Sequence, residues 1–184
     1  MKKIGILVLA LLFALPSAFA ISLPPMIGMQ ANDFEIELID GETFKLSEQR
    51  GKVVLINIWA TGCGPCVAEM PEIDQLAEDY EDDLVVIGIN CGETEQTVAD
   101  FVEENGYGYL FAADPDYEIC SQLNFTNAIP YTIVVDREGV VSALHRGGGY
   151  GVYEVLRAMC SMPWATRASR YWPERGKMKR CKSH

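Results

Sequence analysis

Two cysteines three positions apart, Cys63 and Cys66, stand where an expected strand gives way to an expected helix. The apolar run of residues 53–58 precedes them, and a helical pattern follows. At a helix N-terminus, unpaired backbone N–H groups and the helix dipole favour a thiolate over a thiol. The thiolate is the reactive form, so Cys63 is predicted to be the nucleophile and Cys66, one turn into the helix, the resolving thiol. The spacing therefore predicts a redox-active dithiol.

A zinc site and a purely structural disulfide are the other interpretations of this pair. A zinc site needs a second pair of ligands. The remaining cysteines stand singly in the sequence, and no second Cys-x-x-Cys accompanies the first. We therefore predict no metal site. These cysteines are Cys91, Cys120, Cys160 and Cys181.

Two segments carry a resemblance to a known family. Residues 59–71, WATGCGPCVAEMP, resemble the active-site segment of the TlpA/ResA-like, membrane-associated branch of thioredoxin-fold proteins. Residues 126–136, TNAIPYTIVVD, resemble the loop, cis-proline and following strand of that fold. The resemblance covers residues 30 to 160 and implies a thiol:disulfide oxidoreductase. Gly62 stands where the family usually has an aromatic residue, and Val67 where a basic one is often found. Both departures bear on substrate preference.

The resemblance also assigns a role to Glu69, three residues after Cys66. A carboxylate there could relay the proton that Cys66 loses when it resolves a mixed disulfide, or disfavour a thiolate by like-charge repulsion. The alternative is an ordinary glutamate in the first turns of a helix, favoured by the helix dipole.

A cis peptide bond between Ile129 and Pro130 is a further implication of the resemblance. Such a bond turns the chain sharply and presents the backbone N–H and C=O of the preceding residue to an extended substrate segment. We expect Ile129 and Pro130 to bind substrate in this way. Trp59 and Tyr131 could line the same groove or could belong to the core.

The chain length and its first residues bound the domain organisation. At 184 residues the chain is long enough for one domain with a full core. Residues 1–20 have the basic start, apolar stretch and small-x-small end of a signal peptide. An uncleaved membrane anchor is the alternative, because residues 4–23 are almost continuously apolar. Either way, a thioredoxin-like domain at 21–162 is expected outside the cytoplasmic membrane, in the periplasm or cell envelope, where disulfides persist.

Charge is divided unevenly along the chain. Residues 21–162 hold 6 Lys and Arg against 25 Asp and Glu, a net charge of −19. Residues 163–184 hold 7 against 1, a net charge of +6. The acidic body excludes nucleic acid as a partner, because binding it requires a basic face. The basic tail at 163–184 could fold back onto the acidic body, remain disordered or touch membrane head groups.

The order of the expected elements predicts an α/β class, a thioredoxin-like fold with a central mixed β-sheet flanked by helices and an N-terminal β-hairpin extension. We expect a hairpin at 34–46, strands at 53–59, 84–90, 131–135 and 140–144, and helices from 66 with a bend at Pro71, at 94–105 with Thr94 as N-cap, after Asp114-Pro115, and at 153–159.

The main functional hypothesis is an extracytoplasmic disulfide reductase acting on disulfide-containing client proteins through Cys63 and Cys66. Gly-Pro between the cysteines matches thioredoxin, a strong reductant. No nicotinamide or flavin motif is present, so no cofactor is expected, and a membrane electron-donor protein would recharge the dithiol. Family resemblance suggests cytochrome c maturation as the pathway. The N-terminal segment leaves membrane association open.

Two alternative functions remain open, and so does the disulfide pairing of the four other cysteines. A thiol peroxidase on the same fold would need a wider spacing between threonine and cysteine than Thr61 and Cys63 have. A non-enzymatic copper- or haem-handling protein would use the soft thiolates, with His145 as a further ligand. The four other cysteines allow three pairings, among them Cys91 with Cys120 and Cys160 with Cys181.

Overall fold

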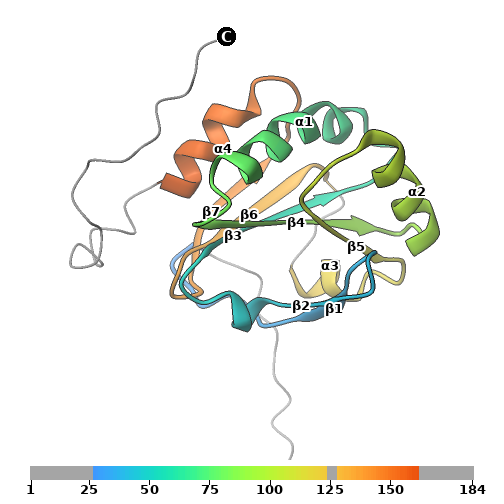
Figure 1. Ribbon diagram of the computed structural model, residues 1–184. Coiled ribbons are helices and arrows are strands. Elements are labelled where there is room, and N and C mark those ends of the chain that lie inside the picture. Colours follow the sequence, from blue (N-terminus) through green and yellow to red (C-terminus); the bar gives the residue numbers. More distant parts are fainter. Residues whose placement is uncertain (1–26, 124–127, 162–184) are drawn as a thin grey trace, which may run out of the picture.

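A five-stranded mixed sheet forms the centre of the computed structural model, which describes residues 27–123 and 128–161 (Figure 1). Strand order is β5-β4-β3-β6-β7. The elements are β1 (Glu35–Glu37), β2 (Thr43–Lys45), η1 (Leu46–Gln49), β3 (Val53–Trp59), α1 (Gly64–Asp79), β4 (Leu84–Cys91), α2 (Glu95–Asn105), β5 (Leu110–Asp114), α3 (Glu118–Gln122), β6 (Tyr131–Val135), β7 (Val141–Arg146) and α4 (Val152–Ser161).

Strand β3 is the central strand and is buried along its whole length. It pairs parallel with β4 and antiparallel with β6. Strand β4 continues parallel to β5, and β6 continues antiparallel to β7. Because both faces of β3 are covered, its sequence is apolar on both faces apart from Asn57, rather than alternating.

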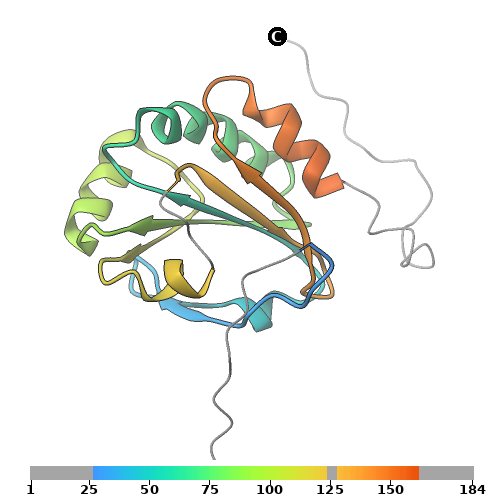
Figure 2. The ribbon, with the colours of Figure 1, turned by 180° about the vertical axis from the view of Figure 1, so that it is seen from behind.

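The two faces of the sheet have separate apolar cores. Val53, Leu55 and Trp59 of β3 pack with α1, α2 and α4, whereas Val54, Ile56 and Ile58 pack with α3 and the N-terminal hairpin. Figures 1 and 2 show α1 and α4 on one side of the sheet and β1, β2 and α3 on the other. Alternate side chains of one strand thus hold the two layers together.

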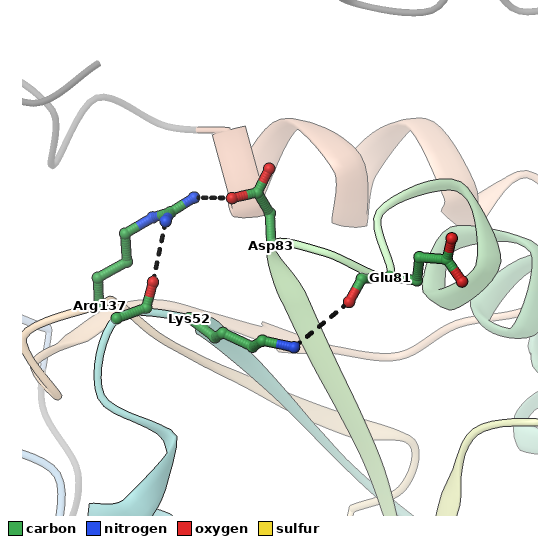
Figure 3. A network of polar contacts seen from close by, with 5 residues as sticks. Lys52, Glu81, Asp83 and Arg137 are labelled. Carbon is green, nitrogen blue, oxygen red and sulfur yellow. Dashed lines mark hydrogen bonds and ion pairs between the residues drawn. The ribbon is translucent and has the colours of Figure 1, made fainter. Parts of the chain in front are cut away.

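A polar network fixes the end of the sheet that lies away from the cysteines (Figure 3). Arg137, in the turn between β6 and β7, donates a hydrogen bond of 2.9 Å to the Gly51 carbonyl and pairs with Asp83 at 2.5 Å. Lys52 donates to the Glu81 carbonyl at 3.5 Å. Exposed pairs of this kind contribute at most about 1 kcal/mol each, so the network serves mainly to align the starts of β3 and β4.

The thioredoxin-like fold and the N-terminal hairpin are confirmed. The Thr94 cap is also confirmed, since its hydroxyl accepts from the Thr97 N–H at 3.3 Å. Helix α1 begins at Gly64 and runs as one helix through Pro71 to Asp79. A proline here removes a single i→i−4 bond, and packing against the sheet holds the remaining turns.

Strand β5 was not predicted. Its sequence, LFAAD, contains two alanines and ends in aspartate, residues that are depleted in strands. It forms because Leu110 to Asp114 can pair with β4, while Ala112 bridges to Leu38 at the hairpin.

The predicted signal segment at 1–20 and the basic tail at 163–184 lie outside the described residues. Within 27–123 and 128–161, no helix has the length and apolar character needed to cross a membrane.

Candidate active site

The N-terminus of α1 holds the dithiol. Cys63 is the N-cap residue, and its Sγ accepts a hydrogen bond from the Cys66 N–H at 3.2 Å. The two cysteines form a disulfide with Cα atoms 5.2 Å apart. Cys63 is half-buried, whereas Cys66 has no exposed surface. An attacking group from outside therefore reaches the sulfur of Cys63 and not that of Cys66.

Glu69 lies one turn beyond Cys66 and is 1% exposed. Its Oε1 accepts a hydrogen bond of 2.9 Å from Asn57, whose amide also donates to Thr132 at 3.2 Å. Burial raises the pKa of the Glu69 carboxyl to about 7, although hydrogen bonds from Asn57 and the Gly149 backbone oppose the shift. A carboxyl with this pKa can both take up and release a proton near neutral pH.

A glycine loop closes over this carboxyl and the adjacent proline. The Ile129–Pro130 peptide bond is cis, as predicted, and the Gly147 N–H donates to the Pro130 carbonyl at 2.9 Å. A Cβ on Gly148 would overlap the Glu69 carboxylate and press on the Pro130 ring. Only glycine therefore fits at position 148.

Trp59 is a core residue, which is the second of the two alternatives that the sequence left open, and it does not line the groove. It has no exposed surface, and its ring packs against Phe101 and Phe111 with centroids 5.2 and 5.8 Å away. Tyr131 is buried too, with the Arg146 guanidinium 5.1 Å from its ring centroid. Trp59 is the last residue of β3 and Tyr131 the first residue of the neighbouring strand β6, and both strands are buried along their whole length.

A second carboxylate, Glu93, holds the turn that precedes the dithiol. It accepts a hydrogen bond of 2.8 Å from the Thr61 N–H and a second, short one from the Thr61 hydroxyl. Asn90 donates to it as well, at 2.5 Å. Partial burial opposes ionisation, but the hydrogen bonds from Thr61 and Asn90 outweigh it and lower the pKa of Glu93. Sequence reasoning missed this residue, because nothing in the local pattern places it beside Thr61.

An open groove of about 540 Å³ runs beside the dithiol on the α1 side. The residues that line it include Gly62, Val67, Pro71, Tyr107 and Tyr150. A Cβ on Gly62 would meet no atom within 4 Å. The two residues that depart from the family pattern, Gly62 and Val67, thus both line this groove.

The remaining cysteines differ from one another. Cys91 and Cys120 form a disulfide, whereas Cys160 has no disulfide partner within 27–123 and 128–161. Burial raises the pKa of the Cys160 thiol to about 12, which disfavours its thiolate form at neutral pH. Cys181 lies outside the described residues, and its pairing stays a prediction.

One group of potential metal ligands occurs in the described part of the chain. The ligand atoms of Cys91, Asp114 and Cys120 lie within 4.8 Å of one another. Both sulfurs belong to the disulfide, and the Asp114 carboxylate accepts hydrogen bonds from the N–H groups of Glu118 and Cys120. In this oxidised form the group offers a metal ion no thiolate.

Comparison with known proteins identifies the family. A model of the Redoxin family matches residues 26–156. The chain belongs to the Redoxin family. Over 122 residues it is 34% identical to the thiol-disulfide oxidoreductase ResA of Halalkalibacterium halodurans, covering 66% of this chain and 69% of that protein. This Redoxin-family protein is a thiol:disulfide oxidoreductase with Cys63 and Cys66 as its redox pair.

Solved structures agree with this assignment. A candidate protein disulfide isomerase from Bacteroides thetaiotaomicron superposes with a TM-score of 0.68 at 30% identity, covering 78% of this chain and 95% of that one. A candidate thiol:disulfide interchange protein DsbE from Chlorobium tepidum gives 0.67 at 26% identity, covering 73% and 95%. The Redoxin-family fold and the TlpA/ResA-like resemblance are thereby confirmed.

The raised pKa of Glu69 predicts a pH-dependent stability. The unfolded chain releases this proton near pH 4.5 and the folded protein near pH 7, so the folded state loses stability as pH rises between these values. Glu69→Gln keeps an acceptor for Asn57 but carries no charge. Its free energy of unfolding should exceed that of the natural protein above pH 7, by on the order of 3 kcal/mol, and approach it below pH 5. Denaturant unfolding from pH 5 to 8.5 measures this.

Glu78→Gln, on an exposed position of the same helix, is the matched control and should run parallel to the natural protein at every pH. A Glu69→Gln curve that also runs parallel would show that Glu69 titrates as an ordinary surface carboxylate.

Proposed function

We propose that this protein is an extracytoplasmic disulfide reductase in which Cys63 attacks and Cys66 resolves. The observation that carries the proposal is the difference in exposure between the two sulfurs at the N-terminus of α1. Cys63 is half-buried and accepts the Cys66 N–H, whereas Cys66 is enclosed. A reductase needs one thiolate that clients can reach and one that acts only within the mixed disulfide.

In the reduced protein, the Cys63 thiolate attacks one sulfur of a client disulfide. The client S–S bond breaks, a mixed disulfide with Cys63 forms, and the other client sulfur leaves as a thiolate that takes up a proton. Cys66 then loses its proton and attacks the Cys63 sulfur, which releases the second client thiol. Two electrons pass from the dithiol to the client, and the Cys63–Cys66 disulfide remains.

Glu69 is the proton acceptor in the second step. Cys66 is fully enclosed, so its proton needs an acceptor within the protein, and Glu69 lies on the same helix one turn away. The Asn57 hydrogen bond orients the carboxylate, and its pKa of about 7 lets it take up the proton and later release it.

Clients are disulfide-containing proteins that bind across the cis-proline loop. The backbone of Ile129, next to the cis bond, offers hydrogen bonds to an extended client segment, and Pro130 provides an apolar floor beneath it. The groove that contains Gly62 then accepts a side chain of the client next to its cysteine.

The cellular setting follows from the sequence. The apolar segment at 1–20 exports the domain, and a membrane electron-donor protein recharges the dithiol, because no nicotinamide or flavin motif is present. Cytochrome c maturation is the pathway that the TlpA/ResA-like resemblance suggests.

Trapping experiments test the assignment of the two thiols. Cys66→Ala should accumulate mixed disulfides with clients, because nothing resolves them, whereas Cys63→Ala should form none. Non-reducing gels and mass spectrometry of the linked peptides measure this, with Cys63→Ala/Cys66→Ala as the blank. Clients trapped on Cys66 in the Cys63→Ala protein would reverse the assignment.

The reduction potential tests the direction of electron flow. We expect a value nearer to the roughly −270 mV of thioredoxin than to the −120 mV of DsbA. No lysine or histidine lies in residues 59–71 to stabilise the Cys63 thiolate further, and the surrounding acidic surface disfavours it. Equilibration with glutathione buffers measures the potential. A value above about −180 mV, that of protein disulfide isomerase, would make the protein an oxidase or isomerase.

A substitution that fills the groove tests how clients bind. Gly62→Trp has room for its Cβ and would place a ring in the groove. Reduction of insulin should slow about tenfold, a loss of about 1.4 kcal/mol of transition-state binding, while reduction of 5,5′-dithiobis(2-nitrobenzoate) stays unchanged. Gln75→Trp adds the same ring to an exposed position of α1 outside the groove and should change neither rate. Equal slowing of both substrates by Gly62→Trp would mean that the dithiol itself was disturbed.

A further inference from the structure

The second disulfide, Cys91–Cys120, is enclosed in the fold. Glu93, two residues after Cys91, contacts Thr61 in the turn that leads to Cys63. Cys91 is the last residue of β4 and is 7% exposed, and Cys120 in α3 is fully buried. Their Cα atoms are 6.5 Å apart. A disulfide with so little exposed surface does not exchange with client proteins, so we expect a structural effect of this disulfide on its neighbours.

Asp114 joins the surroundings of this disulfide into one unit. It pairs with Cys91 across the β4–β5 ladder, and its carbonyl accepts the Gly92 N–H at 3.0 Å. Its carboxylate accepts the N–H groups of Glu118 at 2.9 Å and Cys120 at 2.7 Å. The ends of β4 and β5 and the start of α3 are therefore fixed to one another by hydrogen bonds as well as by the disulfide.

The turn that follows Cys91 also packs closely against the side chain of Tyr117. Gly92 has φ +90°, a conformation that favours glycine, and a Cβ there would overlap the Tyr117 hydroxyl. The chain therefore leaves Cys91 in one direction, and this direction sets where Glu93 points.

Glu93 connects this part of the fold to the turn that precedes the dithiol. Its carboxylate holds both the N–H and the hydroxyl of Thr61, two residues before Cys63. Asn90, the residue before Cys91, donates to the same carboxylate. The Cys63 N–H in turn donates to the Ala60 carbonyl at 3.0 Å, which closes the turn.

We propose that the Cys91–Cys120 disulfide is a positioning element of the dithiol site, acting through Glu93. It anchors residues 90–93, and Glu93 then holds the 60–63 turn so that Cys63 meets the N-terminus of α1 in reactive geometry. Reactivity depends steeply on such placement, since a shift of about 1 Å can cost up to a hundredfold in rate. The proposal concerns the chemistry of Cys63 and holds for either direction of electron flow.

The test measures alkylation of Cys63 directly. The Cys63–Cys66 pair is reduced with limiting dithiothreitol, and reaction with iodoacetamide is followed from pH 5 to 10 by mass spectrometry. Cys91→Ala/Cys120→Ala and Glu93→Ala should each slow alkylation of Cys63 three- to tenfold and displace its pH profile. The variant with all three substitutions should be no slower than either, because both act through one contact. No client is needed, so this test stands even where the proposed reductase function fails.

Val141→Ala is the control for lost stability alone. Val141 is fully buried at the end of the sheet away from the dithiol, so its truncation should lower Tm and leave Cys63 alkylation unchanged. If the disulfide variant fails to fold, Glu93→Ala in the protein with both disulfides intact tests the same link.

Three results would overturn the proposal. The first is a disulfide variant with lowered Tm but an unchanged rate and pH profile for Cys63. The second is fully additive losses, which would mean that the disulfide and Glu93 act independently. The third is mixed disulfides formed through Cys91 or Cys120, which would make this pair a second exchange centre.

Discussion

Burial of a carboxylate beside a thiol is the constraint around which this molecule is arranged. Glu69 would be strongly disfavoured in an apolar interior without a partner, and Asn57 provides one from the central strand. Asn57 takes a place in the row of β3 side chains that face α1, among Val53, Leu55 and Trp59. A single polar residue in an apolar strand thus links α1 to the centre of the sheet.

The same constraint extends to the loops above the site. Thr132 lies opposite Asn57 in the β3–β6 register and shares its amide, so the strand that carries the cis-proline is tied to the network. Gly148 then closes over the carboxylate and Pro130 at a distance that no other residue allows. The cis-proline loop, the Glu69 carboxylate and the central strand are therefore coupled through a few buried contacts, so a substitution at one of them should alter the others.

Electrostatics at the dithiol reflect opposing influences. The N-terminus of α1 and the Cys66 N–H stabilise a Cys63 thiolate. The buried Glu69, when ionised, disfavours it. A two-electron couple shifts by about 30 mV for each 1.4 kcal/mol, so small displacements of these groups can reset the direction of exchange. In the proposed arrangement, Glu93 holds the 60–63 turn and in this way bears on the redox properties as well as the geometry.

Predictions from the sequence succeeded wherever one segment carries its own explanation. The Cys63–Cys66 spacing, the Thr94 cap and the apolar run of β3 each depend on neighbouring residues, and each is confirmed. The cis bond at Pro130 came from a motif of similar locality and is confirmed as well.

Contacts between distant segments needed the tertiary structure. Glu93 lies 32 residues from Thr61, and Gly148 is brought over Glu69 only once β7 has paired with β6. Strand β5 has little strand propensity of its own and exists because β4 offers it an edge. Cys91 joins Cys120 because the sheet order places the end of β4 beside α3. A local pattern records which conformation a segment prefers, but the choice of partner is made by packing and sheet register, which depend on the whole chain at once.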